Sequence, residues 1–216
     1  MKGGYRTIRA TCGTSNGIYY WECEILEGKG HDSHVRVGWS TQKLDVQGPV
    51  GFDKNSFAYR DINGNALNSW SPLLLLWNLR HVIGSKISNN ARVDGYGEKF
   101  QAGDVVGCYI RLDSDPSRNV IRFFKNGTDQ GIAYEGPDIP SGNYFPSVSL
   151  YNEVWKNFPL PIQVVSGPHQ AAVRVNFGPF FILKHDIYGA NPFGELQPMS
   201  AADRWVSVEL VIIRQL

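Results

Sequence analysis

Apolar and polar residues alternate with a period of two in several short stretches of this 216-residue chain. Trp21, Cys23 and Ile25, for example, alternate with Glu22 and Glu24. Successive side chains of a β-strand point to opposite faces, so this pattern predicts a strand with one buried face and one solvent-exposed face. The same alternation predicts further strands near residues 35–38, 106–112, 147–151 and 172–177.

Turn residues separate these stretches at short intervals. Asn126-Gly127 lies between two strand-like runs, at residues 119–125 and 131–134. Asn and Gly readily adopt the positive φ angles of a type I′ turn, so a β-hairpin is predicted here. Many short strands joined by Gly- and Pro-containing turns are typical of an all-β antiparallel sandwich, and this is the fold that we predict.

Three stretches lack this regular alternation. Residues 61–100 are expected to form a long and mostly irregular insertion. Residues 152–171 are interrupted by prolines, and residues 180–198 are expected to form an extended tail that packs along the sandwich. We therefore predict one domain over residues 1–199, with an atypical insertion at about 61–93.

Residues 200–216 differ from the rest of the chain. Ser200 begins a stretch that resembles a helix capping box, and Trp205, Val208, Val211 and Ile212 then recur at helical spacing. β-branched residues are also abundant, so a short C-terminal helix and a strand both remain open. A helix that is apolar on most sides is poorly suited to water. The segment is therefore expected either to pack back on the sandwich or to dock into a groove of a partner.

Composition narrows the classes of function. Hydrophobic residues make up 42% of the chain, which is enough for a full core without disulfides. The net charge is only +1, whereas a protein that binds nucleic acid over its whole surface is far more basic. The three cysteines lack metal-type spacing, so we interpret them as free thiols in a reducing compartment. No signal peptide or membrane span is visible, so we expect no membrane association.

The sequence offers little for catalysis. It contains no Gly-x-Ser-x-Gly elbow, no His-Glu-x-x-His pair and no Gly-Lys-Ser/Thr phosphate loop. His31 and His34 are close in sequence, but a metal site needs further ligands, so we interpret this stretch as a solvated turn. We therefore expect a protein that is not an enzyme and that requires no metal or cofactor.

A set of basic, aromatic and proline residues indicates binding instead. Arg36 alternates with the apolar residues of its predicted strand and is expected to point outward. Arg60 supplies a second cation, and Tyr5, Pro49 and Phe52 supply flat apolar surfaces. Arginine grips a carboxylate through two parallel hydrogen bonds, so the set fits an acidic, partly hydrophobic peptide. The alternative is that both arginines are ordinary solvated surface charges.

Aromatic-glycine phrases follow one another in a fixed order along the chain. They are Gly4-Tyr5-Arg6, Gly17-Ile18-Tyr19-Tyr20-Trp21-Glu22, Val35-Arg36-Val37-Gly38-Trp39-Ser40, Gly103-Asp104-Val105-Val106-Gly107-Cys108-Tyr109, Phe123-Phe124-Lys125-Asn126-Gly127, Tyr144-Phe145-Pro146 and Val175-Asn176-Phe177-Gly178-Pro179. This ordered set resembles a SPRY domain. Its details resemble the SPRY subunit of COMPASS- and MLL-type histone methyltransferase complexes, the Ash-two/Bre-two family.

The resemblance implies a SPRY β-sandwich that serves as a non-catalytic scaffold in the nucleus. In that family a basic and aromatic surface receives an acidic segment of the WD-repeat scaffold subunit. The pair supports a SET-domain methyltransferase that acts on histone H3 lysine. Matched motif by motif, the family's binding positions are Tyr5, Arg36, Pro49, Phe52 and Arg60 in this chain. Phe52 stands where the family usually has Tyr, which keeps the ring and removes one hydroxyl.

The resemblance also implies a second contact at residues 200–216. In the family a short amphipathic helix directly after the SPRY domain inserts into the helical bundle of a Dpy-thirty-like dimer. On this reading Val208, Ile212 and Leu216 are the docking anchors. The family's DNA-binding winged-helix and zinc-finger-like regions have no counterpart in this sequence, so no direct nucleic-acid binding is expected.

Two other functions fit the same fold. A SPRY substrate receptor of a ubiquitin ligase would carry a RING domain or a cullin-binding box. A glycan-binding sandwich would stack sugars on exposed Trp rings and would often bind calcium. A glycan array separates the second function from peptide binding.

Overall fold

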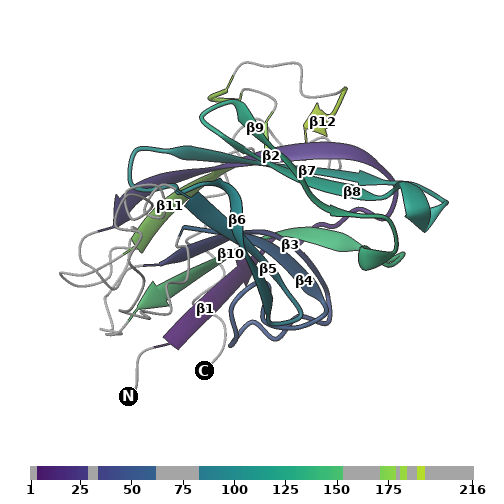
Figure 1. Cartoon of the computed structure of the whole chain (residues 1–216), viewed down its shortest axis with the longest axis horizontal. Coiled ribbons are helices and arrows are strands. Elements are labelled where there is room, and N and C mark those ends of the chain that lie inside the picture. The colour runs from purple at the N-terminus through teal and green to yellow at the C-terminus, as the bar shows by residue number, and fades with distance from the viewer. Residues whose placement is uncertain are drawn as a thin grey trace, which may run out of the picture.

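Two β-sheets packed face to face contain most of the residues that the computed structural model describes (Figure 1). The described residues are 4–28, 34–61, 83–152, 171–178, 181–183 and 189–192. Sheet A has the strand order β1 (Gly4–Arg9), β10 (Tyr144–Asn152), β3 (Val35–Thr41), β4 (Ser56–Arg60), β5 (Ile83–Ser88) and β6 (Ala91–Glu98). Sheet B has the order β11 (Ala171–Asn176), β2 (Gly17–Gly28), β7 (Val105–Leu112), β8 (Val120–Lys125) and β9 (Thr128–Glu135).

Neighbouring strands within these two paths are all antiparallel, as the sequence predicts. A short strand, β12 (Asn191–Pro192), adds to sheet B by pairing with β2 in parallel. Two 3₁₀ turns, η2 (Pro116–Arg118) and η3 (Gly136–Asp138), lie in the connections beside β8 and β9. The described residues contain no helix that is long and apolar enough to cross a membrane.

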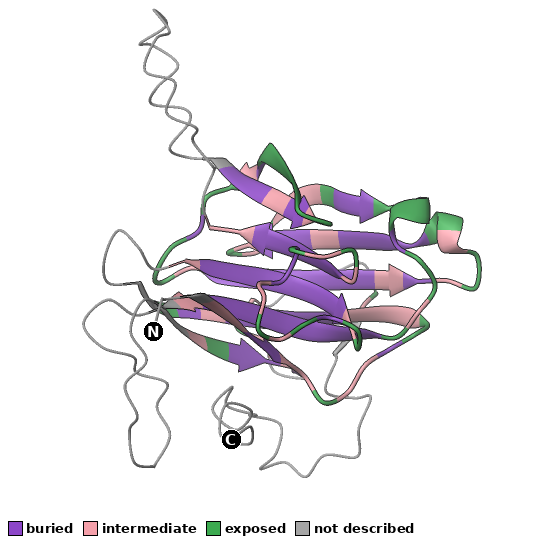
Figure 2. Ribbon diagram, turned by 90° about the horizontal axis from the view of Figure 1, so that it is seen from below, coloured by how far each residue is buried: buried purple, intermediate pink, exposed green. Residues whose placement is uncertain are grey.

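The core lies between the sheets and is built from the alternating apolar residues. Trp21 and Cys23 of β2 face Val37 and Trp39 of β3, and all four are fully buried. The rings of Trp21 and Trp39 meet edge to face at 6.2 Å, a favoured aromatic geometry that adds to the area that they bury. Figure 2 shows that burial runs along most strands, while exposed residues gather in the turns.

The prediction that one face of β2 is exposed to solvent is wrong for Tyr20 and Glu22, which are buried. Glu22 lies on the face of β2 opposite the core, yet it is 0% exposed. Its carboxylate accepts hydrogen bonds from the backbone N–H groups of Ile182 and Leu183, at 2.7 and 3.0 Å. Phe181 packs edge to face on Tyr20 at 4.9 Å. The described parts of the expected tail, residues 181–183 and 189–192, therefore cover this face, and the prediction that the tail packs along the sandwich is confirmed for them.

Two tight hairpins contain residues with positive φ. Asn126 and Gly127 have φ of 50° and 85° between β8 and β9, which confirms the predicted hairpin. Asn89 and Asn90, with φ of 49° and 56°, join β5 to β6 in the same manner. Asn tolerates this left-handed region better than most residues, which explains the second turn.

The expectation that residues 61–100 are mostly irregular is therefore wrong for residues 83–98, because β5 and β6 extend sheet A. The alternation of apolar and polar residues is broken in β5 because Lys86 occupies an inward position, where its ammonium lies 5.2 Å from the ring centroid of Tyr134. Residues 62–82 and 153–170 lie outside the described residues. So does the segment 200–216 with Val208, Ile212 and Leu216.

Candidate binding face

The outer face of sheet A brings the two candidate arginines together. Strand pairing places Arg36 of β3 directly opposite Arg60 of β4, and Ser149 of β10 lies opposite Arg36 on its other side. Val35 and Val37 point into the core, so Arg36 points to the outer face, as the sequence predicts. We call the surface formed by Tyr5, Arg36, Pro49, Phe52 and Arg60 the arginine face.

Arg36 is far more buried than an outward-pointing arginine normally is. Only 7% of it is exposed, and one terminal nitrogen donates a hydrogen bond to the carbonyl oxygen of Val50 at 3.1 Å. Its guanidinium carbon lies 4.6 Å from the ring centroid of Tyr5, within the range of a cation–π contact. The pKa of the Arg36 guanidinium is lowered, chiefly by burial and further by the charge of Arg60, while Tyr5 and the charge of Asp61 act in the opposite direction.

Neither arginine of this pair forms an ion pair with a carboxylate within the described part of the chain, although the charge of Asp61 acts on Arg36. The ion pairs found there involve other residues, and the Nε atoms of Arg36 and Arg60 are buried without a hydrogen bond. Like charges directly opposite each other on neighbouring strands are destabilising, and burial strengthens the repulsion. An anion placed over Arg36 and Arg60 would remove this cost and satisfy the free donors.

A chain of hydrogen bonds anchors the loop of residues 42–55 over this face. The Val50 N–H donates to the Ser149 hydroxyl at 2.6 Å, and the Thr7 hydroxyl donates to the carbonyl of Gly48 at 2.6 Å. The two hydroxyls are 2.6 Å apart, and the Thr7 proton is already used, so Ser149 is the donor to Thr7. This series of hydrogen bonds begins and ends on the loop, and it therefore fixes the position of the loop over β1 and β10.

The anchored loop carries Pro49 and Phe52 on either side of Val50, whose carbonyl accepts the hydrogen bond from Arg36. These residues form a turn in which the Phe52 N–H donates to the Pro49 carbonyl at 3.1 Å. Gly51, between them, has a φ of 85°, and a Cβ atom there would lie 2.4 Å from the Ile87 carbonyl. Only glycine allows this close approach. Phe52 is 55% exposed, which makes it the most exposed of the large apolar side chains in the described residues.

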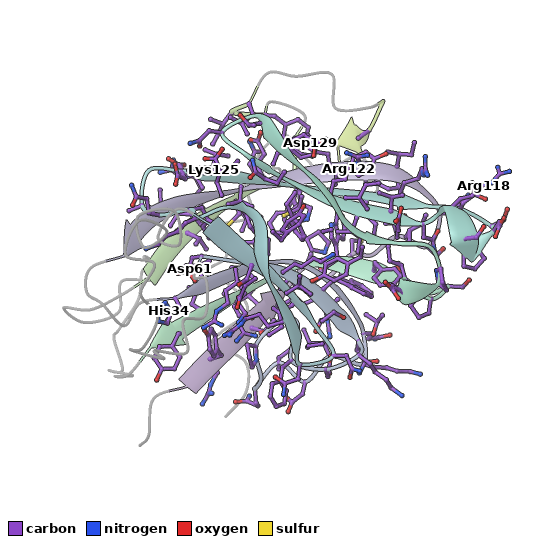
Figure 3. The ribbon with its side chains drawn as sticks, in the orientation of Figure 1. His34, Asp61, Arg118, Arg122, Lys125 and Asp129 are labelled. Atoms are coloured by element: carbon purple, nitrogen blue, oxygen red, sulfur yellow. The ribbon has the colours of Figure 1, made fainter. Side chains whose placement is uncertain are left out.

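A row of rings borders the arginines on the same face. Tyr5 and Tyr151 are paired across β1 and β10 with ring centroids 5.1 Å apart, and His34 lies 6.0 Å from Tyr151. The Nδ1 atom of His34 is 3.5 Å from the Asp61 carboxylate, which also accepts a hydrogen bond from the Val35 N–H at 3.1 Å. Figure 3 shows His34 and Asp61 side by side at one end of the sandwich.

The structure thus brings Tyr5, Arg36 and Arg60 together, with Pro49 and Phe52 on the loop tied to Arg36. Sequence reasoning missed His34, Thr7, Ser149 and Tyr151. A signal was available, because Ser149 and Tyr151 alternate with Val148 and Leu150 and must face outward. Within the described residues, no group of three or more His, Cys, Asp or Glu side chains is placed to hold a metal ion.

The aromatic-glycine phrases fall on the strands and turns of this sandwich. The sequence profile of the SPRY domain matches residues 18–161, which include β2 to β10. The chain belongs to the SPRY domain family. This confirms the family and the fold that the phrases predict.

Several SPRY-containing proteins are similar to this chain. It is 27% identical over 198 residues to the Set1/Ash2 histone methyltransferase complex subunit ASH2 of Drosophila melanogaster, a match that covers 82% of this chain and 32% of that protein. It is 31% identical to the ATP-dependent RNA helicase DDX1 of Xenopus laevis, over 67% of this chain and 15% of that protein. Ran-binding protein 9 of Xenopus tropicalis is 31% identical, over 66% of this chain and 20% of that protein.

Among solved structures, the SPRY domain of human HERC1 has a TM-score of 0.49 and 16% identity, over 81% of this chain and 83% of that chain. These three relatives are much longer than this chain, which spans between 15% and 32% of their length. The similarity therefore covers one region of each relative and does not extend to the rest of those proteins.

Proposed function

We propose that this SPRY domain is a non-catalytic binding module that holds an acidic peptide segment on its arginine face. The observation that carries the proposal is the register pair of Arg36 and Arg60, neither of which forms an ion pair with a carboxylate of the described residues. A carboxylate of the ligand would accept hydrogen bonds from both guanidinium groups, and the rings of Tyr5 and Phe52 would cover its aliphatic stem.

The similarity to ASH2 supports a more specific proposal. That relative is named as a subunit of a histone methyltransferase complex, and the match extends over most of this chain. On this basis the acidic segment belongs to a WD-repeat scaffold subunit, and the assembly supports a SET-domain enzyme that methylates histone H3 lysine in the nucleus. The domain contributes by association, because a held segment stabilises the active arrangement of its partner.

Titration of the whole chain with a synthetic peptide rich in Asp and Glu tests the binding step. Arg60→Ala is the cleanest variant, because the Arg60 side chain makes no hydrogen bond to the described residues. Hydrogen bonds to charged groups contribute about 1.5–3 kcal/mol, so calorimetry should give a Kd at least about tenfold weaker. Arg118→Ala, on an exposed turn, is the matched control and should leave the Kd unchanged. Equal affinities for wild type and Arg60→Ala would refute the proposed site.

A second part of the proposal concerns the segment at residues 200–216. We propose that it docks into the bundle of a Dpy-thirty-like dimer through Val208, Ile212 and Leu216. Deletion of residues 203–216 should then abolish binding of that dimer, measured by calorimetry, and leave the acidic peptide bound with unchanged affinity. Retention of the dimer by the shortened chain, or loss of its cooperative unfolding, would rule this docking role out.

A further inference from the structure

The register of sheet A arranges the candidate site in two parallel rows. The arginine row consists of Ser149, Arg36 and Arg60, and the ring row consists of Tyr5, Tyr151 and His34. Tyr151 lies two residues after Ser149 on β10, and His34 lies two residues before Arg36 in the stretch that leads into β3. The rows therefore run side by side across the strands.

The distance between the rows matches the repeat of an extended peptide. Residues i and i+2 of an extended chain lie about 6.7 Å apart and point to the same side. Two residues along β10 therefore separate the rows by the same distance that separates alternate side chains of a peptide lying along the strands. Side chains at i and i+1 point to opposite sides and cannot reach both rows.

The ring row offers rings where the arginine row offers charge, and because the Arg36 guanidinium lies 4.6 Å from the ring centroid of Tyr5, Tyr151 and His34 are the ring-row positions that Arg36 does not contact. Tyr5, Tyr151 and His34 are all partly exposed, and their rings adjoin one another at 5.1 and 6.0 Å. Asp61 holds the imidazole of His34 at this end of the row through its 3.5 Å contact. Adjoining tilted rings offer an incoming aromatic side chain the edge and face contacts that aromatic pairs prefer.

We propose that the site reads a spaced pair: an acidic residue on the arginine row and an aromatic residue, two positions away, on the ring row. This inference rests on the proposed function and assigns Tyr151 and His34 as residues that determine its specificity. The acidic residue supplies the charge complement, and the aromatic residue fixes the register of the bound segment.

Four labelled nonapeptides titrated against the whole chain by fluorescence anisotropy test the spacing. Each contains the same acidic residue. Two carry Phe two positions before or after it, one carries Phe directly beside it, and one carries Ala in place of Phe. We expect one of the two spaced peptides to bind about tenfold more tightly than the Ala peptide. The adjacent-Phe peptide should bind like the Ala peptide.

Variants then assign the gain to the ring row. Tyr151→Ala should remove most of the advantage of the spaced peptide, so that its affinity falls by a larger factor than the affinity for the Ala peptide. His34→Ala should reduce the advantage in the same direction, and it serves if Tyr151→Ala fails to fold. Ile132→Ala, an exposed apolar position on sheet B, is the control and should retain the full advantage.

The outcomes separate this inference from the proposed function. If the Ala peptide binds and loses affinity in Arg60→Ala, but neither spaced peptide gains, the acidic site stands and the spacing rule is wrong. The rule is equally wrong if the gain survives in both Tyr151→Ala and His34→Ala. If the Ala peptide does not bind the wild type, the proposed function fails and the spacing rule fails with it.

Discussion

The outer face of each sheet contains one buried charged residue, Glu22 on sheet B and Arg36 on sheet A, and the two differ in how they are paired. On sheet B, Glu22 is fully buried, and its carboxylate accepts two backbone N–H groups from residues 181–183. On sheet A, Arg36 is almost as buried, yet it forms no ion pair with a carboxylate of the described residues, and one of its terminal nitrogens donates to the Val50 carbonyl of a loop. Burying a charge costs free energy unless its partners compensate it. The first charge is held by hydrogen bonds within the chain itself, and the second is the one that we propose a ligand carboxylate completes.

The comparison teaches how to separate structural from binding residues on a single fold. A buried charge with all its partners in the same chain holds that chain together. Arg36 and Arg60 share a face and form no ion pair with a described carboxylate, although the charge of Asp61 acts on Arg36, so this face is the candidate site. Four changes test the distinction, ordered from the largest expected effect to the smallest.

Glu22→Ala should have the largest effect on stability. It removes the acceptor of two partly buried backbone N–H groups and of the buried Tyr20 hydroxyl, and a buried donor costs about 1–3 kcal/mol when it loses its partner. We expect the free energy of unfolding, measured by chemical denaturation, to fall by about 2–5 kcal/mol. Glu24→Ala, which breaks only the exposed contact with Arg174, should cost less than about 1 kcal/mol. Equal losses in the two variants would contradict the role of Glu22 as a clamp.

Ser149→Ala should affect stability less and binding more. It breaks the hydrogen bonds that connect Val50 and Thr7, so the unfolding free energy should fall by about 1–3 kcal/mol. The loop that carries Pro49 and Phe52 loses its anchor, so the acidic peptide should also bind more weakly. Ser114→Ala, on an exposed turn, should change neither quantity. A stable Ser149→Ala protein with unchanged peptide affinity would separate the anchor from the site.

The two arginines should differ from each other in stability. Arg36→Ala removes a hydrogen bond to Val50 and buried side-chain packing, so the unfolding free energy should fall by about 1 kcal/mol or more. Arg60→Ala removes a repulsive neighbour and no hydrogen bond to the described residues, so stability should stay within about 0.5 kcal/mol. Both should weaken peptide binding. Thermal unfolding measures the stability of each variant, and calorimetry on the same samples measures its peptide affinity. Equal losses of stability in Arg36→Ala and Arg60→Ala would contradict the structural role assigned to Arg36.

Salt should produce the smallest and most gradual change. Exposed charges are screened over about 8 Å at physiological ionic strength, so the affinity for an acidic peptide should fall as salt rises. Contacts with the rings of Tyr5 and Phe52 should leave a residual affinity at high salt. Titrations between low and high salt that return one Kd would contradict the electrostatic account of the arginine face.

Much of the sandwich could be predicted because its core follows the simple alternation of strands such as β2, β3 and β7. The β5–β6 hairpin could not, because Lys86 points inward and several glycines and polar residues blur the pattern. The burial of Glu22 and Arg36 could not be predicted from the sequence either. Both lie on outward positions, and the segments that cover them, 181–183 and 42–55, come from distant parts of the sequence.

The five predicted site residues follow from local motifs, and the structure adds what depends on strand register. Neither the pairing of Arg36 with Arg60 nor the ring row of Tyr5, Tyr151 and His34 is visible in the sequence, because each joins different strands. Tyr151 and Ser149 become relevant only when β10 is placed between β1 and β3. The sequence thus indicated which side chains could bind a ligand, and it did not indicate which of them become neighbours in the folded sheet.

Hydrogen–deuterium exchange of the whole chain, with and without a saturating acidic peptide, tests the central claim most directly. The account predicts slower exchange at residues 34–36, 48–52, 60–61 and 149–151, which form or border the arginine face. It predicts no change in β7 and β8, which belong to sheet B. Protection confined to sheet B, or bound peptide without protection at these segments, would contradict the assignment of the outer face of sheet A as the binding site.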